Sequence, residues 1–212
     1  SLFVPREKYV WDLVATKQGL FVATGDPGLV YRVPVGGGEA EEWFNSSDVH
    51  VRVLEKESSG SLLVGTSGRG LLIRVKTKKQ DPFVLFDAPR KEISAITTNA
   101  QGKTFFSAVG AEKEAFQESE NDKGPPALLY RIESDGYVEQ VWQAPGPQIY
   151  AMVAAPDGKV WVGTGNPGAV YVVSPEEGTA RRIWESEAAQ VTAMEATPDG
   201  VLIATGNPST LF

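Results

Sequence analysis

The sequence predicts an all-β protein, a β-propeller of four-stranded antiparallel blades. A pattern of glycine, apolar strand, turn and second apolar strand, typical of a β-hairpin, recurs along the chain. The opening glycines follow one another at intervals of 41, 42, 56 and 42 residues, with apolar residues six and nine positions before each. Propeller blades repeat about every 40 to 45 residues. The opening glycines are Gly19, Gly60, Gly102, Gly158 and Gly200.

The first copy shows the expected content of one blade. Apolar runs predict strands at residues 10–14, 20–24 and 29–33, and a last strand is expected at 41–44. The near-continuous apolar character of the middle strands fits strands that are covered on both faces. The apolar residue six positions before each glycine should be buried and equivalent in every blade. These residues are Leu13, Leu54, Ile96, Met152 and Met194.

We expect a single propeller domain, residues 1–212, with five blades' worth of strands. An outer strand is expected at 1–8, and blades at 9–48, 49–90, 91–146, 147–188 and, in part, 189–212. Two arrangements stay open. In the first, residues 2–4 complete the last blade and close a five-bladed ring. In the second, the chain is a segment of a larger, seven-bladed propeller.

Composition excludes several classes of function. The 212 residues carry 27 acidic and 20 basic side chains, a formal net charge of −7, which disfavours nucleic acid as a partner. No apolar run approaches the roughly 18 residues of a membrane span. The absence of Cys and the single His exclude disulfides, thiolate metal sites and multi-histidine metal sites. We therefore expect no metal and no cofactor, and a binding protein is favoured over an enzyme.

The hairpins resemble those of a known class of propeller. The stretches KVWVGTGNPGAVYVV at 159–173 and SLLVGTSGRGLLIRV at 61–75 are similar to blades of bacterial two-component-regulator and NHL-type propellers. That resemblance implies a sensory or docking role in a bacterial protein outside the cytoplasm, either periplasmic or secreted. It supplies no catalytic motif.

The turns that join the second and third strands of each blade contain candidate surface residues. Three of them, Asp-Pro-Gly at 26–28, Asn-Pro-Gly at 166–168 and Asn-Pro-Ser at 207–209, are read as turn chemistry, with proline presetting one position and glycine, where present, relieving a positive φ at the next. The turn of the second blade is Ser-Gly-Arg-Gly at 67–70. The top-face loop residues of the four turns are Asp26, Arg69, Asn166 and Asn207.

A second set of positions directly precedes or begins the first strand of each blade. In a propeller the first strand is innermost, so equivalent residues there should form a ring around the mouth of the central channel. All five are polar or hydrogen-bonding: Tyr9, His50, Glu92, Gln148 and Gln190. A wet channel mouth explains this pattern as well as a site for a small polar ligand or a peptide does.

The third blade carries an acidic insertion at 110–126, with five carboxylates against two lysines. It is read either as a solvated loop or as an arm that contacts a partner near the ring. Its charge favours a cationic or hydroxyl-rich ligand.

Together these features predict a non-enzymatic binding scaffold that recognises a protein or a small polar ligand on the top face. One alternative is a hydrolase or lyase that uses His50 and Glu92 on a small polar substrate. The other is a structural segment of a longer protein, with further blades or domains of that protein as its partners.

Overall fold

The computed structural model describes every residue except 1–2, 77–80, 114–123 and 134. The chain forms two compact units, Ser1–Ile93 and Ser94–Phe212. All regular structure in the described residues is β-strand, and none of those residues forms a helix that could span a membrane. The acidic residues at 114–123 of the predicted insertion lie outside the described residues.

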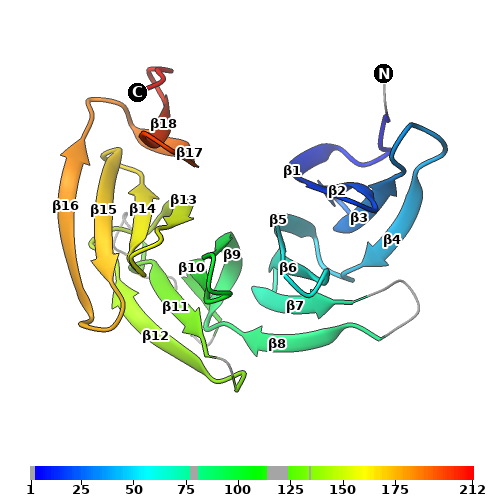
Figure 1. Cartoon of the computed structure of the whole chain (residues 1–212), viewed down its shortest axis with the longest axis horizontal. Helices are drawn as coiled ribbons and strands as arrows, with labels where there is room; N and C mark the ends of the chain where they lie inside the picture. Colours follow the sequence, from blue (N-terminus) through cyan, green and yellow to red (C-terminus); the bar gives the residue numbers. More distant parts are fainter. Residues whose placement is uncertain (1–2, 77–80, 114–123, 134) are drawn as a thin grey trace. The chain divides into compact units, whose positions relative to one another are not determined.

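The first unit holds two four-stranded antiparallel sheets, called blades 1 and 2 (Figure 1). Blade 1 consists of β1 (Tyr9–Thr16), β2 (Gly19–Gly25), β3 (Leu29–Val33) and β4 (Glu41–Asn45). Blade 2 consists of β5 (His50–Lys56), β6 (Leu62–Ser67), β7 (Leu71–Val75) and β8 (Phe83–Asp87). The four strands predicted for the first copy are confirmed. Single bridges, Gly25 to His50 and Ser67 to Glu92, join the first strand of each sheet to the preceding one.

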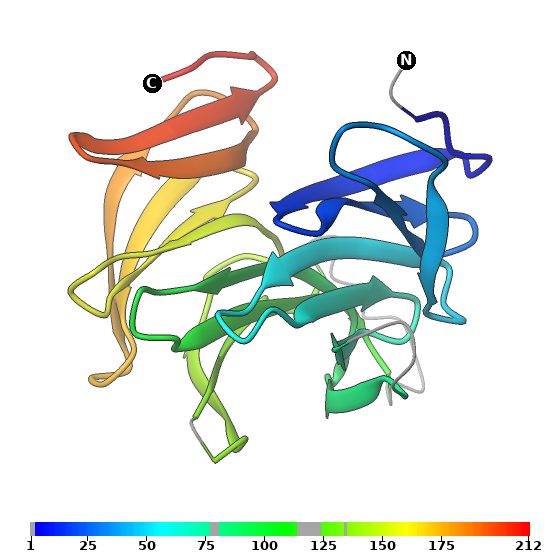
Figure 2. The ribbon, with the colours of Figure 1, turned by 45° about the vertical axis from the view of Figure 1, so that its right-hand side comes forward.

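The unit boundary falls within β9 (Arg90–Thr98), and the second unit continues the same pattern (Figure 2). Blade 3 is completed by β10 (Thr104–Glu112), β11 (Leu128–Ile132) and β12 (Val138–Gln143). Blade 4 consists of β13 (Ile149–Ala154), β14 (Val160–Thr164), β15 (Ala169–Ser174) and β16 (Thr179–Glu185). The hairpin of β17 (Gln190–Thr197) and β18 (Gly200–Gly206) follows, and Leu211 returns to bridge Ala204.

The described residues before β1 differ from the predicted outer strand. Residues 3–8 form no strand, and the ring of Phe3 instead packs on Tyr31 of β3 with centroids 5.0 Å apart. An aromatic contact with the chain's own first blade holds this segment. Ring closure and the number of blades therefore stay predictions.

Local turn chemistry explains why the hairpins form where they do. The five opening glycines all adopt the positive φ that glycine tolerates best: Gly19 (135°), Gly60 (87°), Gly102 (80°), Gly158 (84°) and Gly200 (155°). In four hairpins a threonine hydroxyl near the end of the second strand bonds to backbone at the far side of the next turn. The threonines are Thr24, Thr66, Thr164 and Thr205.

The Asx-Pro-Gly turns correct one expectation. The positive φ falls on the Asx residue, at Asp26 (61°), Asn166 (53°) and Asn207 (56°). It does not fall on Gly28 or Gly168, and the third turn has Ser209 in that place. Gly28 is required by close approach instead, because a Cβ there would lie 2.8 Å from Oγ of Ser46. Asx residues tolerate the left-handed region because their short side chains bond to the local backbone.

Within each unit, the start of a first strand packs on the preceding second strand through the same positions. The apolar residue nine positions before the opening glycine is fully buried in every copy after the first: Val51, Ile93, Ile149 and Val191. Ile93 lies against Gly65 in the first unit, and Val191 lies against Gly163 in the second. Small residues on the second strand thus admit the branched side chain of the next blade.

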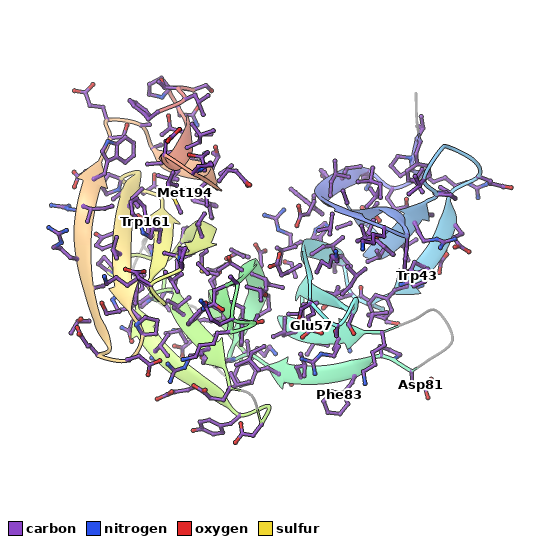
Figure 3. The ribbon with its side chains drawn as sticks, viewed as in Figure 1. Trp43, Glu57, Asp81, Phe83, Trp161 and Met194 are labelled. Carbon is purple, nitrogen blue, oxygen red and sulfur yellow. The ribbon has the colours of Figure 1, made fainter. Side chains whose placement is uncertain are left out.

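The core prediction is confirmed at three positions and wrong at one. Leu54, Ile96 and Met152 are buried, and Met194 (Figure 3) is half-buried. Leu13 is 54% exposed. The physical reason is that the described residues before β1 form no strand, so no sheet of the first unit precedes blade 1 to cover this side chain.

Replacing Gly163 by Ala should destabilise the second unit by roughly 1–3 kcal/mol, because the new methyl overpacks a filled site. Its Cβ would lie 2.6 Å from Cγ1 of Val191 and 3.0 Å from its Cβ. Chemical denaturation measures the change. Gly206→Ala is the matched control, since its nearest neighbour is the exposed Thr192 at 3.1 Å. Equal stability of the two variants would contradict the packing rule.

Candidate functional site

The five ring positions occupy equivalent places in the two units. Tyr9, His50 and Gln190 are the first residues of β1, β5 and β17, Glu92 is the third residue of β9, and Gln148 directly precedes β13. In the first unit His50 and Glu92 each bridge the end of the preceding second strand. In the second unit Gln190 bridges Gly165 in the same way. This bridge to the preceding second strand explains why His50, Glu92 and Gln190 stand in one register.

A β-bulge follows directly in each first strand whose pairing is resolved. The bulges lie between Val10 and Asp12, Val51 and Val53, Ile149 and Ala151, and Val191 and Ala193. The extra residues are Trp11, Arg52, Tyr150 and Thr192. A bulge redirects one side chain without disturbing the core residues on either side.

Sequence reasoning missed the bulge residues although a signal for them was present. Two apolar residues three positions apart, such as Val51 and Leu54, cannot face the same side of a regular strand, whose side chains alternate. An extra residue between them restores the alternation. The odd spacing therefore indicates a bulge, and Arg52 lies within it.

In the first unit the bulge residues and the ring residues meet in one group, which we call the Trp11 cluster. It consists of Tyr9, Trp11, His50, Arg52 and Glu92. The rings of Tyr9 and Trp11 stack with centroids 5.0 Å apart and planes at 18°. The guanidinium carbon of Arg52 lies 3.8 Å from the centroid of the Trp11 ring, and its Nε donates to Oε1 of Glu92 at 3.1 Å.

Trp11 is therefore held between two partners. The guanidinium carbon of Arg52 lies 3.8 Å from the centroid of the Trp11 ring, and the ring of Tyr9 stacks on Trp11 at 5.0 Å. Such cation–π contacts contribute about 0.5–1 kcal/mol at exposed sites and more when they are desolvated. Tyr9 and Trp11 are 44% and 39% exposed, so a sizeable aromatic surface remains open to a ligand.

His50 is oriented by the same tryptophan. The indole Nε1–H of Trp11 donates to Nδ1 of His50 at 3.3 Å, and the His50 ring stands edge-on to both aromatic rings. Because Nδ1 accepts this hydrogen bond, the neutral imidazole carries its proton on Nε2. His50 therefore presents a hydrogen-bond donor through Nε2.

Gly25 makes this arrangement possible. A methyl group at Gly25 would overlap with Nδ1 of His50 and with Nε1 of Trp11. The φ of Gly25 is not positive, so alanine would suit the backbone there. The absence of a side chain at this position is needed only for the approach of the two rings.

The top-face loop residues lie near the ring positions within each unit. Asp26 pairs with Lys8 at 2.6 Å, and its amide donates to the carbonyl of Val49, next to His50. The hydrogen bond from Lys8, and then its charge, lower the pKa of Asp26. Arg69 is bound to the neighbouring loop instead, through the carbonyls of Ser46 and Ser47.

In the second unit both asparagine turns adjoin the loop that leads to Gln190. The amide of Asn166 donates to the carbonyl of Ala189 at 2.6 Å, and the amide of Ala189 donates to the carbonyl of Asn207 at 3.0 Å. Gly165 lies against both Tyr150 and Gln190.

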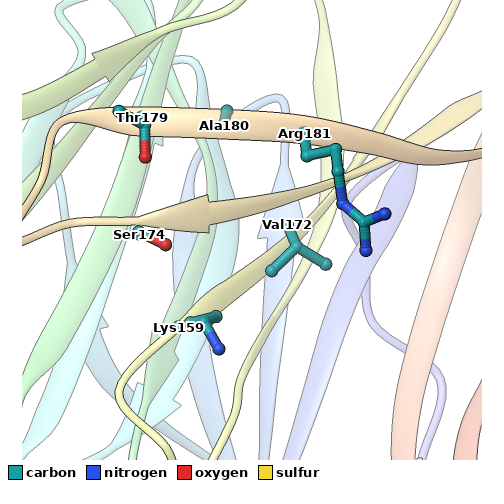
Figure 4. Close-up of a pocket in the computed structure, with 6 residues that line it drawn as sticks. All are labelled: Lys159, Val172, Ser174, Thr179, Ala180 and Arg181. Atoms are coloured by element: carbon teal, nitrogen blue, oxygen red, sulfur yellow. The ribbon is translucent and has the colours of Figure 1, made fainter.

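Two cavities of the described residues lie away from the Trp11 cluster. One of about 350 Å³ is lined by Lys159, Val172, Ser174, Thr179, Ala180 and Arg181 (Figure 4). Lys159 is already paired with Asp157 at 2.7 Å, and that hydrogen bond lowers the pKa of Asp157. Another, of about 380 Å³, lies beside Phe3 and Tyr31. Burial and a hydrogen bond to Glu7 raise the pKa of Tyr31 to about 12, so its hydroxyl stays protonated.

Neither cavity gathers groups suited to catalysis. The described residues contain no cluster of three or more His, Asp or Glu side chains that could hold a metal ion. The Trp11 cluster is the place where aromatic, cationic, acidic and imidazole groups meet. We take it as the candidate site.

Comparison with known sequences supports the propeller assignment. Residues 143–166, from the end of β12 to the turn after β14, match the family described as two component regulator propeller. The predicted resemblance is confirmed over this stretch, which includes Gln148. A search of curated proteins gave no significant match.

Solved structures extend the likeness to nearly the whole chain. A streptogramin B lyase superposes with a TM-score of 0.74 at 13% identity, covering 99% of this chain and 70% of that one. Virginiamycin B lyase from Staphylococcus aureus gives 0.71 at 15% identity, with 96% and 69% covered. A chain of the nidogen/laminin complex gives 0.69 at 12% identity, with 92% and 70% covered. At these identities the likeness shows the fold alone: the chain has a β-propeller fold, which serves enzymes and binding proteins alike.

Proposed function

We propose that this chain is a non-enzymatic recognition module whose ligand or partner binds at the Trp11 cluster. The observation that carries the proposal is an exposed stack of two aromatic rings beside a fixed arginine. Tyrosine and tryptophan offer large contact areas at low entropic cost and, with arginine, dominate recognition surfaces. Placement on the first strands of a rigid scaffold keeps the group preorganised.

The contacts within the Trp11 cluster favour a recognition role over a hydrolase or lyase activity. Nδ1 of His50 accepts from Trp11, so this nitrogen is not the free acceptor that a general base needs. One oxygen of Glu92 accepts from Arg52, which fixes the carboxylate within the cluster. A recognition surface needs only fixed donors and ring faces, which the Trp11 cluster has.

A role within a longer propeller is compatible with this function. Val10 and Leu13 are 49% and 54% exposed, although their equivalents in blades 2 to 4 are buried. That surface would be covered by another blade. The insertion at 110–126 is proposed as a separate contact arm, and deleting 112–123 tests it independently of the Trp11 cluster.

Trp11→Ala should lower binding at least 10-fold, because it removes the ring on which both Tyr9 and Arg52 pack. Screening arrays of saccharides and short peptides with the intact chain identifies ligands, and titration compares the variants. His50→Ala and Glu92→Ala should weaken the same ligand. The control is Phe83→Ala, which removes a ring that is 65% exposed on the outer strand β8 of the same unit (Figure 3).

A ligand whose affinity is unchanged by Trp11→Ala, His50→Ala and Glu92→Ala would contradict this assignment. Turnover of a bound molecule by the wild-type chain, lost in His50→Ala, would favour the hydrolase or lyase alternative. Circular dichroism checks that each variant is folded.

A further inference from the structure

The guanidinium of Arg52 is fixed on one side and open on the other. Its Nε is bonded to Glu92, and its flat face lies on Trp11, yet the side chain remains 23% exposed. The two terminal nitrogens have no hydrogen-bond partner among the described residues, and neither is a buried atom. A guanidinium presents two forks of N–H groups, and here the end-on fork is unoccupied.

The carboxylates around this fork already have hydrogen-bond partners. Glu92 uses one oxygen on Arg52, Asp26 is paired with Lys8, and the carboxylate of Asp12 accepts the amides of Leu13 and Leu54. Burial raises the pKa of Asp12, which its two backbone hydrogen bonds offset in part. No second described carboxylate is hydrogen-bonded to Arg52, so an incoming anion would not have to displace one.

The remaining features fit an anion attached to a ring. Tyr9 offers an exposed ring face next to Trp11. His50, whose Nδ1 accepts from Trp11, offers an Nε2–H donor on the same strand as Arg52. Planar end-on pairing with a carboxylate is the geometry that arginine favours most.

We propose that the Trp11 cluster binds a small organic acid, with its carboxylate on the terminal nitrogens of Arg52 and its ring or sugar face against Tyr9. This inference rests on the proposed function and specifies its ligand. We propose an anionic ligand in place of the cationic one expected from the acidic insertion, because Arg52 and His50 both offer hydrogen-bond donors at the site. Aromatic acids and sugar acids share the required chemistry.

The test uses two matched pairs of probes, benzoate with benzamide and glucuronate with glucuronamide, titrated into the intact chain and followed by NMR. Each pair differs in the carboxylate and little else. At least one acid should bind at least 10-fold more tightly than its amide, and the preference should fall as salt is raised. Arg52→Gln should reduce the ratio to about 1, and Arg52→Lys should keep part of it.

Two further variants keep the outcome interpretable. Gly25→Ala changes none of the five residues of the Trp11 cluster, but its methyl group would displace the side chains of Trp11 and His50. The variant should therefore weaken binding of both the acid and the amide of a pair. Arg182→Gln removes an exposed arginine of the second unit and should change nothing.

Equal binding of acids and amides, an acid preference that survives Arg52→Gln, or no binding of either acid would overturn the inference. If a neutral saccharide or peptide from the arrays still loses affinity in Trp11→Ala, the proposed function is supported without the organic-acid inference. If no ligand loses affinity in Trp11→Ala, both the proposed function and the organic-acid inference are rejected.

Discussion

Leu54→Ala should destabilise the protein by about 2–5 kcal/mol, whereas Leu13→Ala should cost about 1 kcal/mol or less. The two leucines hold the same repeat position on the first strands of neighbouring blades. Leu54 is 3% exposed and packs in a cluster with Phe21, Val51 and Val64, whereas Leu13 is 54% exposed. Truncating Leu54 leaves a cavity that rigid strands cannot fill, but truncating Leu13 removes only a partly covered side chain.

Chemical denaturation of both variants and the wild type measures the difference. Equal losses would mean that the surface of Leu13 is covered in the folded protein, as ring closure or a further blade would require. The same experiment therefore tests the packing rule and the closure predicted from the strand count. A Leu13→Met variant, which keeps the apolar volume, serves as the conservative control.

Arg131→Ala should destabilise the second unit by about 2–3 kcal/mol. The Arg131 side chain is only 10% exposed, and it contacts Glu133, Glu139 and Glu176. Removing one partner of a buried ion pair costs about 3–5 kcal/mol. The lower value is expected here because water screens the three carboxylates, which are 31%, 47% and 67% exposed.

The matched control is Arg182→Ala. Arg182 is 53% exposed and pairs with Glu185 three residues further along the same strand. Its removal should cost at most about 0.5 kcal/mol. If both arginine variants lose the same free energy of unfolding, the three ion pairs of Arg131 stabilise the protein no more than one surface ion pair does.

The pH dependence of the Arg131 variant has a definite sign. Burial acts to lower the pKa of Arg131, but Glu176, Glu133 and Glu139 outweigh it and raise the pKa. Hydrogen bonds from Lys103 and then Arg131 lower the pKa of Glu176 below its unfolded value. The stability that ionised Glu176 contributes to the folded state is fully present above its unfolded pKa of about 4.3. This stability is lost as the pH falls through the folded pKa. The difference in the free energy of unfolding between wild type and Arg131→Ala should therefore become smaller below about pH 4. Chemical denaturation across pH 3–7 measures this difference.

Strand order and turn positions could be predicted because their causes are local. A glycine with positive φ at Gly60, followed by Leu62–Ser67, specifies a hairpin through neighbouring residues alone. The same holds for the ring positions, which follow from counting back from each glycine. His50 and Glu92 were found in this way, and the structure places both in the Trp11 cluster.

The sequence by itself determined the fold class, the strand order and the register of the repeats, because hairpin periodicity depends on residues close together in the chain. Only the tertiary structure decided which side chains meet. Trp11 and His50 are 39 residues apart, and Arg52 and Glu92 are 40 apart, so each contact depends on how one blade seats against the next. The exposure of Leu13 also depends on the tertiary structure. A side chain on the face of a blade is buried only when a neighbouring sheet covers it, which the leucine itself does not determine.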